Sequence, residues 1–239
     1  LDFKLVFNQN NGTASRVAIS GINKEGGGAL TGGETVIRLG LQVTGKPSGV
    51  ETVAFYPVNG SSIYDAASPA LAMGTAQTTG PLTLNDQVPP IMVFSPGHGV
   101  RGVGIGSMVT ISFSEPVRNI DNSILTDENV DALITLKSTN ISGADIPFDA
   151  TVSTNKKTIT IDPTEYLESL QYVYVGIGSS LEDSLNNAIP DSSVTFVVAD
   201  VEAPIVVFNP AHGDTGVAFN ENITLTFSEP IRHKNNEGP

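Results

Sequence analysis

Residues 86–118 read DQVPPIMVFSPGHGVRGVGIGSMVTISFSEPVR, and residues 200–232 repeat the pattern 114 residues later as DVEAPIVVFNPAHGDTGVAFNENITLTFSEPIR. About half of the aligned positions are identical. Before the first FSEP, apolar Val109, Ile111 and Phe113 alternate with threonine and serine, and the second copy keeps this alternation. A period of two predicts a strand with one buried and one solvated face. The repeat therefore predicts consecutive modules that each contain this strand.

Short runs rich in Val, Ile and Thr between the two copies predict further strands. Together with the repeated block they make seven: Ile91–Phe94, Met108–Phe113, Ala132–Leu136, Phe148–Val152, Thr158–Ile161, Tyr172–Gly176 and Val194–Val198. The segment Pro163–Leu170 is expected to form a short helical turn. Seven strands in a unit of this size are typical of an immunoglobulin-like sandwich. We predict an all-β chain of tandem immunoglobulin-like β-sandwich modules.

The module boundaries follow from a second similarity, between residues 60–65 (GSSIYD) and residues 178–183 (GSSLED). Each segment leads through a polar loop into a last strand, and then to Asp86 or Asp200. We therefore predict modules at residues 1–86, 87–200 and 201–239. Proline follows each junction closely, which favours a short, stiff connection over a flexible tether.

Two family resemblances support this organisation. The runs PIMVFSP (90–96) and FSEPV (113–117) resemble the bacterial Ig-like domains of S-layer and other large surface proteins. This resemblance covers Asp86 to Asp200 and restarts at Asp200. Residues 16–21 (RVAISG) and 35–45 (TVIRLGLQVTG) resemble the later half of a cohesin-like sandwich. The resemblances imply a secreted or cell-surface bacterial protein.

Charge and composition exclude several function classes. The net charge of −13 lacks the positive field that nucleic acids or anionic membranes require. No apolar run approaches the roughly 20 residues that span a bilayer, so we expect no membrane insertion. Cysteine is absent, which excludes disulfides and thiolate chemistry. The chain opens on Leu1 without an initiator methionine, and we expect it to be cut from a longer exported precursor.

Residues with catalytic potential have simpler interpretations. His98 and His212 occupy equivalent positions of two repeated turns, so we expect turn residues, and His233 has no motif around it. The glycines of residues 102–106 lack the spacing of a phosphate loop, and the second copy keeps one of them. No motif of a hydrolase or metalloprotease is present. We expect no enzyme.

Calcium is the one ligand for which the sequence offers candidate residues, although no cofactor is certain. Hard cations bind several carboxylate and carbonyl oxygens. Carboxylates gather at the module ends, where Asp86 and Asp200 are the candidate calcium ligands beside Glu202. Further acidic residues lie in loops, at Asp121, Asp127, Glu128, Asp131 and Asp183. No EF-hand or repeat-type calcium motif is present, and acidic loops are commonly just solvated.

The function predicted from these features is structural: modules in series space or project another part of an adhesin, an S-layer-associated protein or a secreted multimodular protein. Their expected partners are other modules of the same protein. The alternative is a binding module that recognises a protein partner through its cohesin-like part, or a glycan. Tyr56, Tyr64 and Tyr166 could serve as glycan platforms, but they fit packing or strand edges equally well.

The two ends of the chain predict self-association. Leu1–Val6 and Ile223–Phe227 are expected to be strands without their full sheets, and an isolated pair of strands is marginal in water. Unpaired edges accept further strands. We therefore expect another copy of the chain to complete the partial modules by strand addition. The alternative is that the fragment simply lacks the missing strands.

Overall fold

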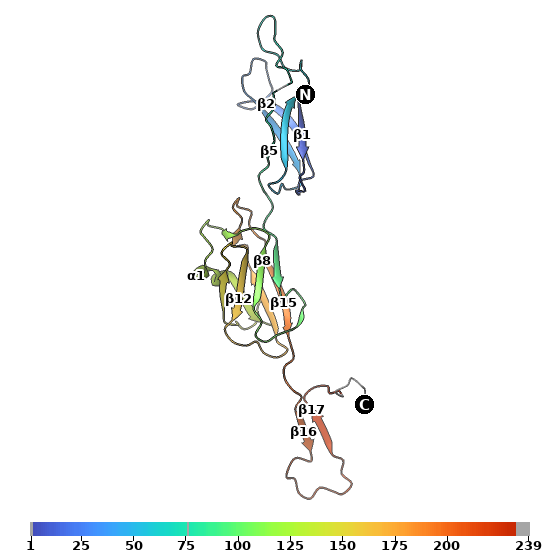
Figure 1. Ribbon diagram of the computed structural model, residues 1–239. Helices are drawn as coiled ribbons and strands as arrows, with labels where there is room; N and C mark the ends of the chain where they lie inside the picture. The colour runs from blue at the N-terminus through green and yellow to red at the C-terminus, as the bar shows by residue number, and fades with distance from the viewer. Residues whose placement is uncertain (1, 76, 233–239) are drawn as a thin grey trace.

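A computed structural model describes residues 2–75 and 77–232 of the chain. The strands form three groups in chain order, shown in Figure 1. We call them the N-terminal module (to residue 86), the central module (87–200) and the C-terminal hairpin (201–232). Among the described residues, the regular secondary structure is almost entirely β-strand, as predicted.

The central module consists of two four-stranded sheets, in the orders β11-β12-β8-β6 and β10-β13-β15-β7. Pairing is antiparallel except between β15 and β7. In a small third sheet, β9 (Arg118–Asn119) pairs with β14 (Leu181–Glu182). The eight main strands are β6 (Met92–Ser95), β7 (Arg101–Val103), β8 (Val109–Phe113), β10 (Ile134–Ser138), β11 (Phe148–Val152), β12 (Thr158–Pro163), β13 (Tyr172–Ile177) and β15 (Ser192–Val198).

The alternation predicted for β8 and β12 is confirmed. Ile111 and Ile159 lie opposite each other in the register and are fully buried in the core, while Phe94 packs against that core as a half-buried side chain. Val109, Phe113 and Ile161 are buried as well. The outward-facing Thr110, Ser112, Thr158 and Thr160 are half-buried. One face of this sheet therefore supplies the core and the other meets solvent.

The helical turn predicted for Pro163–Leu170 is wrong. The segment forms bends and a turn, because the Leu167 N–H bonds to the Ile105 carbonyl (2.9 Å) instead of to its own segment. The helical residues lie elsewhere, in α1 (Asp127–Val130) and a 3-10 turn at Asp131–Leu133 that leads into β10. Within the described ranges, no helix is long and apolar enough to cross a membrane.

The sequence repeat reappears as the same hydrogen-bonding pattern. In the C-terminal hairpin, β16 (Val206–Asn209) pairs with β17 (Thr224–Phe227) in the register of β6 with β8. Ser228 and Ile205 exchange two hydrogen bonds of 2.9 Å, as Ser114 and Ile91 do at 2.9 and 3.0 Å. The hairpin has no second sheet among the described residues, so Leu225, the counterpart of Ile111, is 50% exposed.

The N-terminal module pairs its strands in two small sheets, β1-β4-β5 and β2-β3. The strands are β1 (Phe3–Asn8), β2 (Arg16–Lys24), β3 (Ile37–Thr44), β4 (Thr52–Pro57) and β5 (Leu82–Thr83). Val53 and Ala54 of β4 and Val17 of β2 are buried. The predicted strand Leu1–Val6 corresponds to β1, although Leu1 itself lies outside the described residues.

Candidate metal site at the module junction

Asp86 lies in the connection between β5 and β6 and is held from both sides. Its Oδ1 accepts a hydrogen bond from the Val88 N–H (2.8 Å), which fixes the turn into the prolines. The N–H of Gln87 bonds to the carbonyl of Pro47 in the N-terminal module (2.8 Å). The carbonyl of Asp86 accepts a hydrogen bond from Asn187 Nδ2 of the central module (3.2 Å). The backbone at Asp86 and Gln87 is thus hydrogen-bonded to both modules.

Asp183 belongs to the loop that follows β14 and is 1% exposed. Its Oδ1 accepts hydrogen bonds from the backbone N–H groups of Leu185 (2.7 Å) and Asn187 (2.9 Å). Its Oδ2 accepts a hydrogen bond from Asn187 Nδ2 (2.7 Å). Asp183 therefore stabilises the loop, and Asn187 links Asp183 to the backbone of Asp86.

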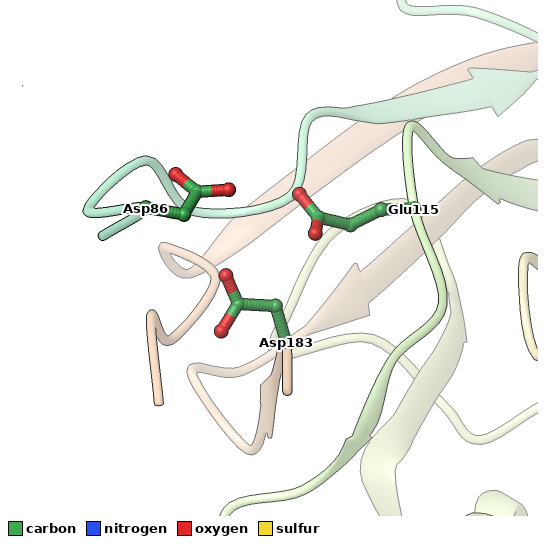
Figure 2. A group of neighbouring side chains, drawn as sticks. All are labelled: Asp86, Glu115 and Asp183. Atoms are coloured by element: carbon green, nitrogen blue, oxygen red, sulfur yellow. The ribbon is translucent and has the colours of Figure 1, made fainter. Parts of the chain in front are cut away.

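Glu115 lies two residues after the end of β8, in the FSEP motif. It points at the other two carboxylates in Figure 2, where Asp86, Glu115 and Asp183 converge. One oxygen from each of the three side chains lies within 4.8 Å of the others. Burial, followed by the charges of Asp183 and Asp86, raises the pKa of Glu115, and Lys157 opposes this effect. The cluster therefore concentrates negative charge that costs free energy when all three groups are ionised.

The donor set of this cluster fits a hard divalent cation. Calcium binds oxygen at 2.3–2.6 Å, so two oxygens on one ion lie no more than about 5 Å apart. The three oxygens meet this condition. Calcium takes six to eight oxygens, and backbone carbonyls and water would supply those that the carboxylates do not. A cation here would also neutralise the repulsion that raises the pKa of Glu115.

The second junction repeats two of the three carboxylates. Asp200 is exposed, and its Oδ1 accepts hydrogen bonds from Ser169 Oγ (3.1 Å) and the Glu202 N–H (3.2 Å). Burial, then the charge and a hydrogen bond of Asp200 and the charge of Glu202, raise the pKa of Glu229. Asp200 and Glu229 thus repeat Asp86 and Glu115. The described residues contain no third carboxylate in a ligand-spaced group with them.

The structure joins some of the predicted site residues and separates others. Asp86 meets Asp183, which the sequence placed merely among the acidic loops, whereas the paired candidate Asp200 lies at the other junction. Glu115 was missed, although the repeat carries a signal for it: both copies keep an aspartate and a glutamate 29 positions apart. Calcium binding by these residues stays a prediction.

The histidines lie where the repeat placed them. His98 and His212 are both in turns, and His98 Nδ1 accepts a hydrogen bond from the backbone N–H of Thr195 (3.3 Å). This bond ties the turn after β6 to strand β15. His233 lies outside the described residues.

A match to a protein-family model supports the sandwich at the centre of the chain. Residues 86–198 match the family model described as the bacterial Ig-like domain. The crystal structure of CopC from Methylosinus trichosporium OB3b is similar at 16% sequence identity and a TM-score of 0.34, over 48% of this chain and 97% of that one. No curated protein matches the sequence. The Ig-like part of the predicted resemblance is confirmed, while the S-layer type and the cohesin-like part stay predictions.

Proposed function

We propose that this run of Ig-like β-sandwich modules is a stiff spacer in a secreted or cell-surface bacterial protein, without catalytic activity of its own. The observation that carries the proposal is the double attachment of the first junction. Pro47 binds the backbone of Gln87 from one module, and Asn187 binds the backbone of Asp86 from the next. Relative motion is the default for linked domains, so a junction held from both sides favours a mechanical role.

The residues around the junction suit such a role. Gly49 adopts a positive φ of 78°, and a Cβ there would lie 3.3 Å from the Cβ of Asp86, so glycine allows a close approach. Pro89 and Pro90 follow at once, and Pro90 is buried. Proline restricts the backbone and reduces the freedom of the connection. A divalent cation on Asp86, Glu115 and Asp183 would add a further link between the connection and the central module.

Charge supports a role in a crowded surface array. The net charge of −13 keeps neighbouring copies apart and soluble. The same field would accumulate divalent cations at the carboxylate cluster. Stiffness and solubility would then depend on the same acidic residues.

Nitrogen-15 relaxation of the whole chain tests the spacer role. If the junction is stiff, amides of β4 and of β12 tumble with one common correlation time. Asn187→Ala removes the side chain that binds Asp86, and the two modules should then acquire separate correlation times. Asn155→Ala, in an exposed turn of the central module, is the matched control. Separate correlation times in the unmodified chain would refute the proposal.

A further inference from the structure

A hollow of about 560 Å³ lies beside Tyr166, at the end of β12 and away from the carboxylate cluster. It is lined by apolar Ile105 and Pro163, by Gly106, and by the polar residues Asp162, Thr164, Glu165 and Tyr166. This volume falls within the roughly 300–1,000 Å³ of small-molecule sites. The spacing role described above leaves the hollow unexplained.

The ring of Tyr166 is exposed to solvent and lies beside Gly106. Its side chain is 78% exposed, although it carries a large apolar surface. On one side the ring lies against Gly106, where an added Cβ would come within 3.1 Å of Cε1. The next residue, Leu167, is buried in the core, and its N–H bonds to the Ile105 carbonyl (2.9 Å). Gly106 thus leaves room for the ring at the edge of the hollow, and the buried Leu167 fixes the backbone beside it.

Three polar side chains of the hollow have no partner among the described residues, whereas Thr164 Oγ1 donates a hydrogen bond to the Pro147 carbonyl (3.4 Å). Within the described part of the chain, no hydrogen bond or ion pair engages the side chains of Asp162, Glu165 or Tyr166. Two carboxylates can accept hydrogen bonds there, and the phenol can donate one. Apolar surface and unengaged hydrogen-bonding groups therefore line the same space.

We propose that this hollow binds a saccharide, with Tyr166 as the stacking platform and Asp162 and Glu165 as acceptors for sugar hydroxyl groups. A sugar ring has an apolar C–H face for the tyrosine and Ile105 and a rim of hydroxyl donors for the carboxylates. The lining combines both characters, and its volume exceeds what a single lysine or arginine head group would fill. A basic peptide segment is the competing ligand, because the carboxylates and the ring would also attract a cation.

Saturation-transfer NMR and calorimetry of the whole chain with trisaccharides of glucose, mannose, galactose and N-acetylglucosamine test this site. At least one trisaccharide should bind, with an affinity that is unchanged between low and physiological salt. Tyr166→Ala should weaken binding by about tenfold, as the loss of an aromatic contact does. Gly106→Ala should also weaken it by displacing the ring. Tyr64 is another exposed tyrosine, in the N-terminal module, and Tyr64→Ala should bind as the unmodified chain does.

The melting temperature separates binding from folding. Tyr166 is exposed, so Tyr166→Ala should melt with the unmodified chain, and Glu165→Gln provides a second variant that keeps the side-chain volume. The proposal is overturned if none of the trisaccharides binds. It is equally overturned if a lysine-rich peptide binds instead, with an affinity that salt abolishes, or if Tyr166→Ala and Tyr64→Ala lose the same affinity.

Discussion

Glu51 shows how one buried carboxylate organises the N-terminal module. The side chain is fully buried at the start of β4. Burial favours a raised pKa, but hydrogen bonds from the N–H groups of Ala14 (2.8 Å) and Ser48 (2.8 Å) and from the Ser48 hydroxyl outweigh it and lower the pKa of Glu51 to about 2. The carboxylate thus joins two loops next to Gly49, which lies against Asp86.

Glu51→Gln should lower the free energy of unfolding of this module at pH 7 by about 1–3 kcal/mol, because it leaves buried N–H groups poorly paired. The folded-state pKa is depressed, so this stability is present above the ordinary pKa of 4.5 and is lost as the pH falls toward 2. Urea unfolding, followed at the amides of β4 at both ends of this pH range, measures the loss of stability. Exposed Glu25→Gln is the control, and an unchanged midpoint at pH 7 would contradict the role of Glu51.

Glu115 should behave in the opposite way, because its pKa is raised. An ionised Glu115 destabilises the fold, and this cost disappears on protonation as the pH falls below the folded-state pKa. Without divalent ions, Glu115→Gln should therefore raise the melting temperature at pH 7 and have little effect in acid. Calorimetric melting measures this, with exposed Glu168→Gln as the control. A lower melting temperature for Glu115→Gln at pH 7 would contradict the repulsion.

The same variant tests the calcium prediction. Calcium should raise the melting temperature of the unmodified chain, excess EDTA should reverse the rise, and Glu115→Gln should respond much less. An unchanged melt of the unmodified chain in EDTA and in calcium would remove the calcium hypothesis.

At the scale of the element, β8 and β17 have the same pattern in different surroundings. Ile111 of β8 is fully buried, and Ile111→Ala should cost about 2–5 kcal/mol of stability. Leu225, its counterpart in β17, is half exposed, so Leu225→Ala should lower the stability much less. Urea unfolding of both variants compares them directly. Equal losses would mean that the hairpin has a core that the described residues do not show.

Strands were predictable because their signal is local, and the site was not because it depends on distant contacts. The apolar residues of β8 and β12 alternate, so their buried faces follow from the sequence. Pro163–Leu170 was misjudged because its hydrogen bonds go to Ile105 and Ala199 rather than to itself. Asp183 lies 97 residues from Asp86, and the two meet where Asn187 donates hydrogen bonds to the Asp183 carboxylate and the Asp86 carbonyl. A contact between residues this far apart in the sequence leaves no periodic pattern from which it could be predicted.

Self-association stays a prediction at the scale of the whole molecule. Apolar side chains of the C-terminal hairpin, such as Phe208 and Leu225, are exposed among the described residues. Strand addition by a second copy would cover part of this surface. Sedimentation velocity should show a dimer or larger species at high concentration, and Leu225→Lys should shift it toward monomer. A strictly monomeric chain at all concentrations would contradict the prediction.

The distance between the first two modules tests the central claim of a stiff spacer most directly. The chain has no cysteine, so two introduced cysteines are the only sites at which a spin label attaches. They are Gln42→Cys in β3 and Thr151→Cys in β11, both at exposed positions. An insertion of Gly-Ser-Gly-Ser-Gly-Ser after Gln87 supplies the flexible reference. Double electron–electron resonance should give one narrow distance distribution for the intact junction and a broad one for the insertion, with Asn187→Ala between them. A distribution for the intact chain as broad as that of the insertion would contradict the claim.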